Sequence, residues 1–156
     1  GFAVLAGEQL SREGANLDQI EQLVLRKTAR TTVFFSVNTL EYLRRSGRIS
    51  SARAAVGQAL KVKPILTLRG GEVVSLEKTR TNAKAMARMV QLVTESVHGP
   101  VEIAVQHLDA QERASQLSAD LHLQLPGTSI VQCSIGAVVA AHTGPGIVAT
   151  VISPLN

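Results

Sequence analysis

A histidine and a threonine stand together late in the chain, in a segment whose backbone must turn sharply. Residues 140–146 read Ala-Ala-His-Thr-Gly-Pro-Gly, between a small apolar run and a strand-like run. Glycine permits positive φ and close approach to a ligand, and proline fixes φ. A turn of this kind can hold the imidazole of His142 still, where it can hydrogen-bond an acidic group and change protonation. The alternative is a tight connection in which His142 only caps a helix, since one histidine beside a Gly-Pro turn is a weak signal.

Two groups of basic side chains offer contacts to an anion. Arg48 follows Gly47 and precedes a helix with a serine cap, so its guanidinium can fork onto a carboxylate or phosphate beside the helix amides. Lys78 and Arg80 begin another helix and offer a second contact to the same anion. The alternative for both groups is surface charge. That alternative, a solvated helix end, is favoured for the remaining arginines of the first group, Arg44, Arg45 and Arg53.

The sequence lacks the motifs of several enzyme classes. It has no Walker loop, no Gly-x-Gly-x-x-Gly after a strand and no Gly-x-Ser-x-Gly elbow. His98, His107 and His122 have no partner at a metal-ligand spacing, and the single cysteine, Cys133, cannot build a zinc cluster. We therefore expect no metal, no cofactor and no catalytic residue, and we interpret these three histidines as structural or solvated.

Composition indicates one globular domain, or one domain plus a fragment. The chain has 156 residues and is 45% hydrophobic, which excludes wholesale disorder. Aromatic residues make up only 3%, so the core must consist of Val, Leu, Ile and Ala. The net charge of +4 favours anionic partners. One cysteine excludes an internal disulfide and fits a reducing cytoplasm, the localisation that we expect.

From residue 31 onward, strand and helix patterns alternate, which predicts a layered α/β domain. Gly70 and Gly71 form a hairpin turn, Ser50 or Ser51 caps one helix, and Asp109 caps another. The expected strands are 31–37, 61–68, 72–76, 101–106, 129–133 and 147–152. The expected helices are a short one after residue 38, then 52–60, 82–97, 110–123 and 134–141.

The first 30 residues carry two helical patterns and no evident chemistry. The first spans 2–12, and the second follows a cap at Asn16. Because the chain opens at Gly1 inside a helical pattern, we expect a piece of a longer protein. We expect the helices of 1–30 to belong to a domain whose remainder is missing, and 31–156 to form the layered α/β domain. No apolar run reaches the length of a membrane span, and no signal peptide is visible.

Three stretches together resemble the DegV family of bacterial fatty-acid-binding proteins. Residues 38–50 read Asn-Thr-Leu-Glu-Tyr-Leu-Arg-Arg-Ser-Gly-Arg-Ile-Ser, residues 60–66 read Leu-Lys-Val-Lys-Pro-Ile-Leu, and residues 142–146 read His-Thr-Gly-Pro-Gly. The Lys-Thr-Arg step at 78–80 and its helix fall where the family pattern has them. One departure is Ser46, where the family usually has a second glycine, which stiffens that turn.

The resemblance implies a two-lobed α/β protein that encloses one long-chain fatty acid between its lobes. This chain looks like the C-terminal lobe, a layered α/β/α structure with a mixed sheet, preceded by two helices of a truncated N-terminal lobe. By the same resemblance, His142 holds the ligand carboxylate within a turn that includes Thr143 and Gly144. The resemblance implies that hydroxyl groups from residues before Gly1 hold the same carboxylate together with His142. Arg48 and Arg80 are then expected near the carboxylate entrance.

The resemblance also implies a binding protein, not an enzyme by itself. Such proteins present the acid to a separate ATP-dependent fatty acid kinase, which makes the acyl-phosphate. The expected partners are thus a long-chain fatty acid, the kinase and, transiently, a membrane surface. The residue chemistry agrees, because Val, Leu and Ile can line a channel, whereas burying a carboxylate without hydrogen-bond partners costs several kcal/mol.

Two other functions stay open from the residues alone. The chain could be a stand-alone enzyme of phosphate or acyl-phosphate chemistry that uses His142, Arg48 and Arg80, although no nucleotide or metal motif supports it. The second open function is nucleic-acid binding through the basic turn that contains Arg44, Arg45, Arg48 and Arg53. Few aromatic residues and basic residues spread along the chain argue against it, so we expect no nucleic acid as a partner.

Overall fold

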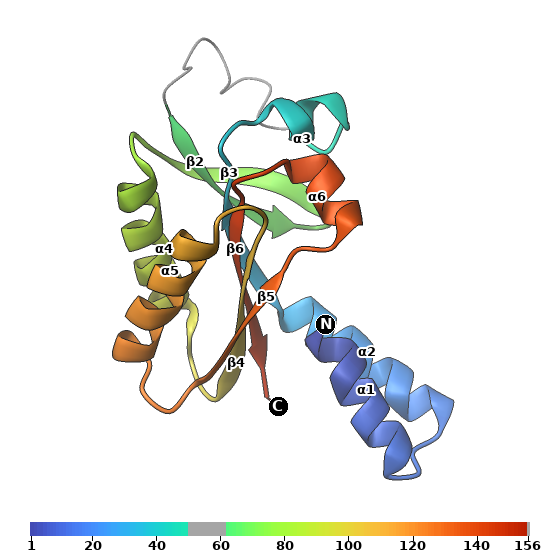
Figure 1. Ribbon diagram of the computed structural model, residues 1–156. Helices are drawn as coiled ribbons and strands as arrows, with labels where there is room; N and C mark the ends of the chain where they lie inside the picture. Colours follow the sequence, from blue (N-terminus) through green and yellow to red (C-terminus); the bar gives the residue numbers. More distant parts are fainter. Residues whose placement is uncertain (50–61, 156) are drawn as a thin grey trace.

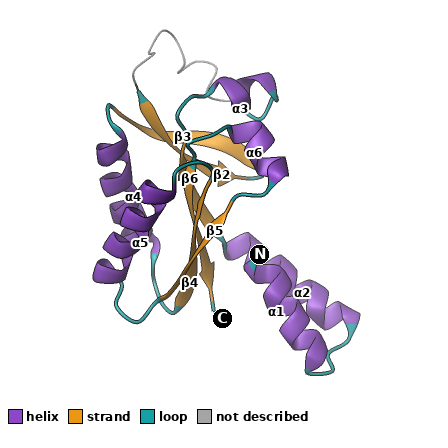
Figure 2. Cartoon of the chain, in the orientation of Figure 1, coloured by secondary structure: helices purple, strands orange, loops and turns teal. Residues whose placement is uncertain are grey.

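The computed structural model describes residues 1–49 and 62–155. Its centre is a six-stranded sheet with helices on both faces (Figure 1, Figure 2). The strands run in the order β3-β2-β1-β6-β4-β5, and only β4 and β5 pair in parallel. The predicted layered α/β architecture with a mixed sheet is confirmed. The strands are β1 (Thr32–Ser36), β2 (Lys63–Arg69), β3 (Glu72–Thr79), β4 (Val101–His107), β5 (Ser129–Ser134) and β6 (Val148–Pro154).

Two pairs of helices cover opposite faces of this sheet. Helices α4 and α5 bury Met89 and Leu117 against one face, and α3 and α6 lie on the other, where Leu43 is buried. Phe34 and Phe35 are neighbours in β1 and enter opposite clusters, as the alternation of a strand requires. The helices are α1 (Phe2–Arg12), α2 (Leu17–Arg30), α3 (Glu41–Arg45), α4 (Asn82–Ser96), α5 (Gln111–Gln124) and α6 (Ala137–Thr143).

Helices α1 and α2 form a hairpin that extends away from the sheet (Figure 1). The predicted cap at Asn16 is confirmed: its side chain accepts from the backbone of Gln19 in a capping box. Gly7 is buried where the helices meet, because a Cβ there would lie 3.1 Å from Val24. The glycine therefore lets the two helices approach closely.

A buried lysine joins the hairpin to the sheet. The Lys27 side chain is 8% exposed, donates to the carbonyl of Pro154 at 2.7 Å and pairs with Glu102 at 2.9 Å. Two oxygen partners compensate the ammonium for its loss of water. The contact ties α2 to the ends of β4 and β6, while the proposed lobe boundary between residues 30 and 31 stays a prediction.

Two predicted boundaries were wrong. Asp109 does not cap α5: the N-cap is Ala110, and Asp109 adopts φ +50° in the loop before it. The expected helix at 134–141 begins later, because β5 continues its pairing with β4 through Ser134. The helix also ends later than expected, at Thr143, so His142 lies in its last turn and not in the loop after it. The Gly70–Gly71 turn is confirmed, with positive φ at both glycines. Residues 50–61, with the predicted helix 52–60, its serine caps and Arg53, lie outside the described residues.

An ion-pair network clips α4 to the edge of the sheet. Arg88 donates to Glu77 on β3 at 2.9–3.0 Å. It also pairs at 3.1 Å with Glu95, seven residues further along α4. The hydrogen bond from Arg88 lowers the pKa of Glu77. A lowered folded-state pKa stabilises the fold above the usual range of glutamate, and this contribution is lost as pH falls through the folded-state value.

We expect Glu77→Gln to lower the melting temperature at pH 7 by about 2 °C, since the pair is partly exposed. The difference from wild type should shrink as pH falls below the usual glutamate range, because both proteins then lack the charge. Melting curves from pH 7 to pH 2.5 measure this. Glu21→Gln on α2 is the matched control, and a difference that grew with acidity would contradict the assignment.

Candidate functional site

His142 ends helix α6 with its ring half-buried. Its Nδ1 atom is buried, and no hydrogen-bond partner for it exists among the described residues. Thr143 beside it is buried and donates its hydroxyl to the carbonyl of Val139 at 2.9 Å, which closes the last helical turn. A buried polar atom without a hydrogen-bond partner costs free energy. The imidazole of His142 can therefore still form a hydrogen bond to a ligand or to another chain.

Asn38 connects the motifs that the sequence analysis singled out. Its side-chain amide donates to the carbonyl of Pro145 at 3.4 Å. The ammonium of Lys63 reaches the Asn38 backbone and side-chain oxygens, both at 3.4 Å. Thr79 in turn donates to the Lys63 carbonyl at 3.0 Å. The described parts of these segments, 38–49, 62–66, 78–80 and 142–146, therefore meet at one end of the sheet.

Side chains of the α3 segment also occupy the space beside the two glycines of the turn. A Cβ on Gly144 would lie 2.3 Å from the ring of Tyr42, and one on Gly146 would lie 1.8 Å from the amide of Asn38. Both glycines have positive φ, +74° and +84°. Two independent constraints, backbone conformation and close packing, therefore require glycine at each position.

The far end of the turn rests on the segment between β4 and α5. The Gly146 amide donates to the Leu108 carbonyl at 2.7 Å, and Arg113 donates to the Gly146 carbonyl at 2.9 Å. The Leu108 amide donates to the carbonyl of Ile147 at 3.2 Å. This support from α5 was not foreseen from the sequence, because Arg113 belongs to none of the recognised motifs.

The two arginines predicted at the entrance are both exposed. Arg48 lies in the loop after α3, where its amide donates to the Leu43 carbonyl at 3.0 Å, and Arg80 lies between β3 and α4. Neither guanidinium contacts His142 in the part of the chain that the structure describes. Their role at an entrance therefore stays a prediction.

Arg44 and Arg45 differ from Arg48 because both bind Glu41 within α3, at 2.7 and 2.8 Å. The hydrogen bond from Arg44, with a smaller one from Arg45, lowers the pKa of Glu41. The pairs are exposed and belong to one short helix. They fit the interpretation of a solvated helix end.

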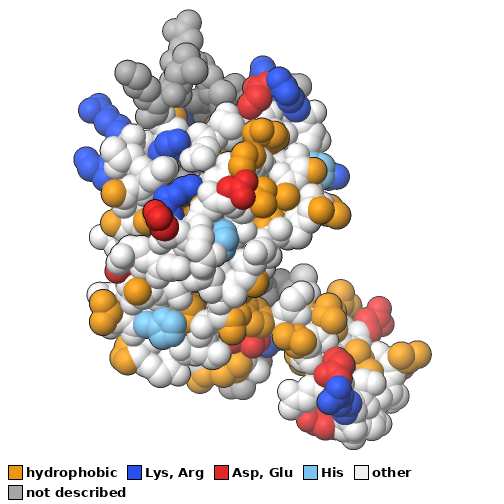
Figure 3. Space-filling view, in the orientation of Figure 1, with side chains coloured by type: hydrophobic (Ala, Val, Ile, Leu, Met, Phe, Trp, Pro, Cys, Tyr) orange, Lys and Arg blue, Asp and Glu red, His pale blue; other side chains and the backbone are white. Residues whose placement is uncertain are grey.

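The sheet face that carries α3 and α6 also holds an apolar row that these helices leave partly open. Val33, Val151, Ala104 and Val131 are consecutive partners across β1, β6, β4 and β5. Val131 is 47% exposed. Helix α6 adds Val138 and Val139, exposed by 77% and 51% (Figure 3, hydrophobic side chains around α6 at the right). Exposed apolar side chains of this extent on one face indicate a surface that another apolar group covers.

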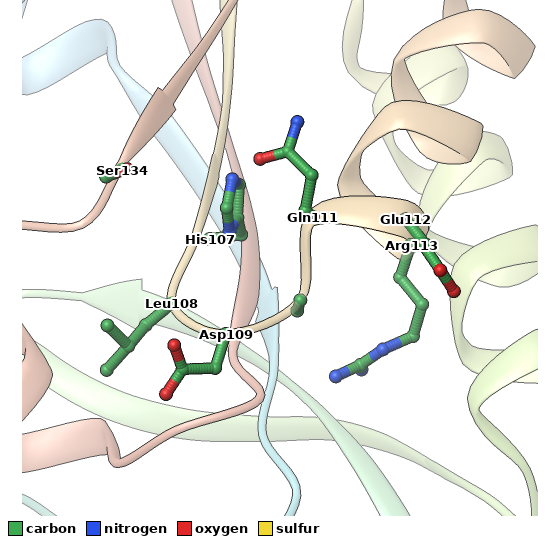
Figure 4. A pocket seen from close by; sticks show the side chains of 8 residues that line it. His107, Leu108, Asp109, Gln111, Glu112, Arg113 and Ser134 are labelled. Carbon is green, nitrogen blue, oxygen red and sulfur yellow. The ribbon is translucent and has the colours of Figure 1, made fainter.

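A separate open hollow of 480 Å³ lies where β4 and β5 end and α5 begins. Figure 4 shows His107 beside Gln111, and Arg113 extending toward the loop of Leu108 and Asp109. His107 is buried, and its Nδ1 has no partner within the described ranges. Both polar and apolar residues line the hollow, Asp109 among them, and it does not include His142.

The described residues hold neither a metal-binding cluster nor a membrane-spanning helix. In residues 1–49 and 62–155, no group of three or more His, Cys, Asp or Glu side chains is placed to hold a metal ion. None of the helices in these ranges has the length and apolar character needed to cross a membrane.

Gly144→Ala should lower the melting temperature by about 10 °C, because the methyl group adds a clash with Tyr42 to the strain of positive φ. Gly127→Ala is the matched control: its φ is +80°, but nothing lies within 4 Å of the added carbon. Strain alone should cost it about 4 °C. Equal losses in the two variants would show that the packing of Tyr42 on Gly144 contributes nothing.

Comparison with known proteins places this arrangement in a family. The family model described as uncharacterised protein, DegV family, matches residues 1–155. A DegV domain-containing protein of Streptomyces coelicolor is 44% identical over 155 residues, which cover 98% of this chain and 55% of the relative. Protein DegV of Bacillus subtilis is 36% identical over 94% of this chain and 53% of its own length. The chain thus spans about half the length of the curated relatives it matches.

Solved structures agree with these relatives. The fatty acid binding DegV family protein of Streptococcus agalactiae superposes with a TM-score of 0.91 at 35% identity, covering 100% of this chain and 56% of that one. DegV of Bacillus subtilis, described as a fatty acid binding protein, superposes with a TM-score of 0.83 at 32% identity, covering 98% and 55%. The chain belongs to the DegV family.

Proposed function

We propose that this protein binds a long-chain fatty acid along the apolar row and holds the carboxylate at His142. The observation that carries the proposal is the buried Nδ1 of His142, which has no partner among the described residues, on the sheet face that also holds that row. An acyl chain would cover the exposed valines, and its carboxylate would accept a hydrogen bond from the imidazole. Each exposed apolar side chain that the ligand covers contributes in proportion to the area removed from water.

The ligand class draws support from the relatives. The Streptococcus agalactiae and Bacillus subtilis proteins are described as fatty acid binding, and both are more than 30% identical to this chain. Both are also longer, with this chain covering 56% and 55% of them. In this proposal the remaining half supplies the opposite wall of the channel and the hydroxyls that share the carboxylate with His142.

The role after binding is to present the carboxylate, without catalysis by this protein, to a separate fatty acid kinase. Arg48 and Arg80 support this step, because both are exposed and flank the meeting point of the motifs. Their charge suits an acidic kinase surface or the added phosphate. We place the protein in the cytoplasm, where loading involves a transient contact with a membrane surface.

Lipid extracted from the full-length protein after expression in bacteria should contain long-chain fatty acid at close to one molecule per chain. Mass spectrometry of the extract measures it. Delipidated protein should then bind oleate. An empty extract together with no oleate binding would overturn the proposed ligand.

His142→Ala should weaken oleate binding by about tenfold, the effect of losing one hydrogen bond to a charged group. It should also lower kinase-dependent acyl-phosphate formation. His122→Ala is the control, since His122 is exposed on α5 and its ring bonds the Ser118 carbonyl of its own helix. Turnover of ATP by the isolated protein would instead support the second candidate, an acyl-phosphate enzyme that uses His142, Arg48 and Arg80.

A further inference from the structure

We propose that Arg113 is a positioning residue for His142: by holding the far end of the turn it fixes where the imidazole points. The inference rests on the proposed function of His142 and adds a residue from helix α5, on the opposite face of the sheet. Arg113 lies outside the recognised motifs. Its guanidinium donates a hydrogen bond to the carbonyl of Gly146, which is 33 residues later in the sequence.

The contacts of Gly146 show why this position controls the turn. Its amide donates to Leu108 at 2.7 Å and its carbonyl accepts from Arg113 at 2.9 Å, so both of its backbone polar groups are bound to one loop-and-helix unit. Gly146 is buried, its φ is +84°, and the Asn38 amide occupies the space where a Cβ would lie. That packing restrains where Gly146 lies, and the two backbone hydrogen bonds restrain how its peptide groups are oriented.

The near end of the turn has no side chain from α5 bonded to it among the described residues. It is held by the packing of Tyr42 beside Gly144 and by bonds within α6, from the Gly144 amide to Ala140 at 2.8 Å and from the Thr143 hydroxyl to Val139 at 2.9 Å. Helix α6 has only seven residues, a length at which a helix has little stability of its own. Its orientation, and with it that of the His142 ring, depends on what holds the chain on either side.

Arg113 differs from the paired arginines described above in that its described partner is a carbonyl, while its side chain is partly buried. The other arginines with partners described above, Arg88, Arg44 and Arg45, each pair with a carboxylate. Arg113 makes no ion pair among the described residues, although Glu112 adjoins it in the hollow. Its side chain is partly buried, and burial lowers the pKa of the guanidinium. A charged donor on a carbonyl forms a stronger hydrogen bond than a neutral one, which suits a position that must not move.

The test uses the full-length protein, delipidated, with Arg113→Gln, Arg113→Lys and the surface control Arg12→Gln. The side-chain resonances of His142 are assigned by their loss in His142→Ala. Arg113→Gln should shift or broaden the His142 imidazole signals in lipid-free protein while those of His122 stay in place. It should also weaken oleate binding by about tenfold, equal to about 1.4 kcal/mol. Arg113→Lys keeps a charged donor and should restore affinity to within about threefold of wild type.

The outcomes separate this inference from the proposed function. Unchanged His142 signals in both folded Arg113 variants would overturn the positioning role, even if oleate affinity fell. An equal loss in glutamine and lysine variants, with a melting temperature lowered to match, would assign Arg113 to stability alone and also overturn it. Failure of the wild-type protein to bind oleate would count against the proposed function, while the lipid-free spectra would still decide the role of Arg113.

Discussion

The site depends on the packing of side chains into space that two glycines leave empty. The ring of Tyr42 and the amide of Asn38 lie where Gly144 and Gly146 would carry side chains. Steric exclusion of this kind is steep in distance, so it locates the turn relative to α3 more sharply than a single long hydrogen bond does. The meeting of four sequence segments at one end of the sheet follows from this fit, and the hydrogen bonds of Asn38 and Lys63 then complete it.

Much of the fold could be predicted from the sequence because its elements carry local signals. The Asn16 cap, the Gly70–Gly71 turn and the strand pattern from residue 32 all rest on short-range chemistry, and each is found in the structure. The errors lie where pairing between distant segments decides a boundary. Ser134 stays in β5 because it pairs with His107, which moves the start of α6 beyond residue 134.

The supports of the candidate site show the same division. The resemblance identified His142 and its turn, but the partners of that turn are long-range. Asn38 and Tyr42 were part of a recognised motif without a physical role, and nothing in the helical pattern around Arg113 points to Gly146. A guanidinium on an amphipathic helix normally faces solvent. The guanidinium of Arg113 instead reaches the Gly146 carbonyl, because the start of α5 lies beside the end of β4.

The strand order has a consequence for how the protein forms. β1 lies between β2 and β6, so the first and the last of the described strands pair in the middle of the sheet. Before β6 is synthesised, β1 has one neighbour, and the half of the sheet that holds β4 and β5 has no partner to connect it to the other half. Contacts of such large sequence separation close slowly, because the intervening chain loses its entropy first. The turn of His142 directly precedes β6, so ribosomal synthesis completes this turn and the described sheet almost together.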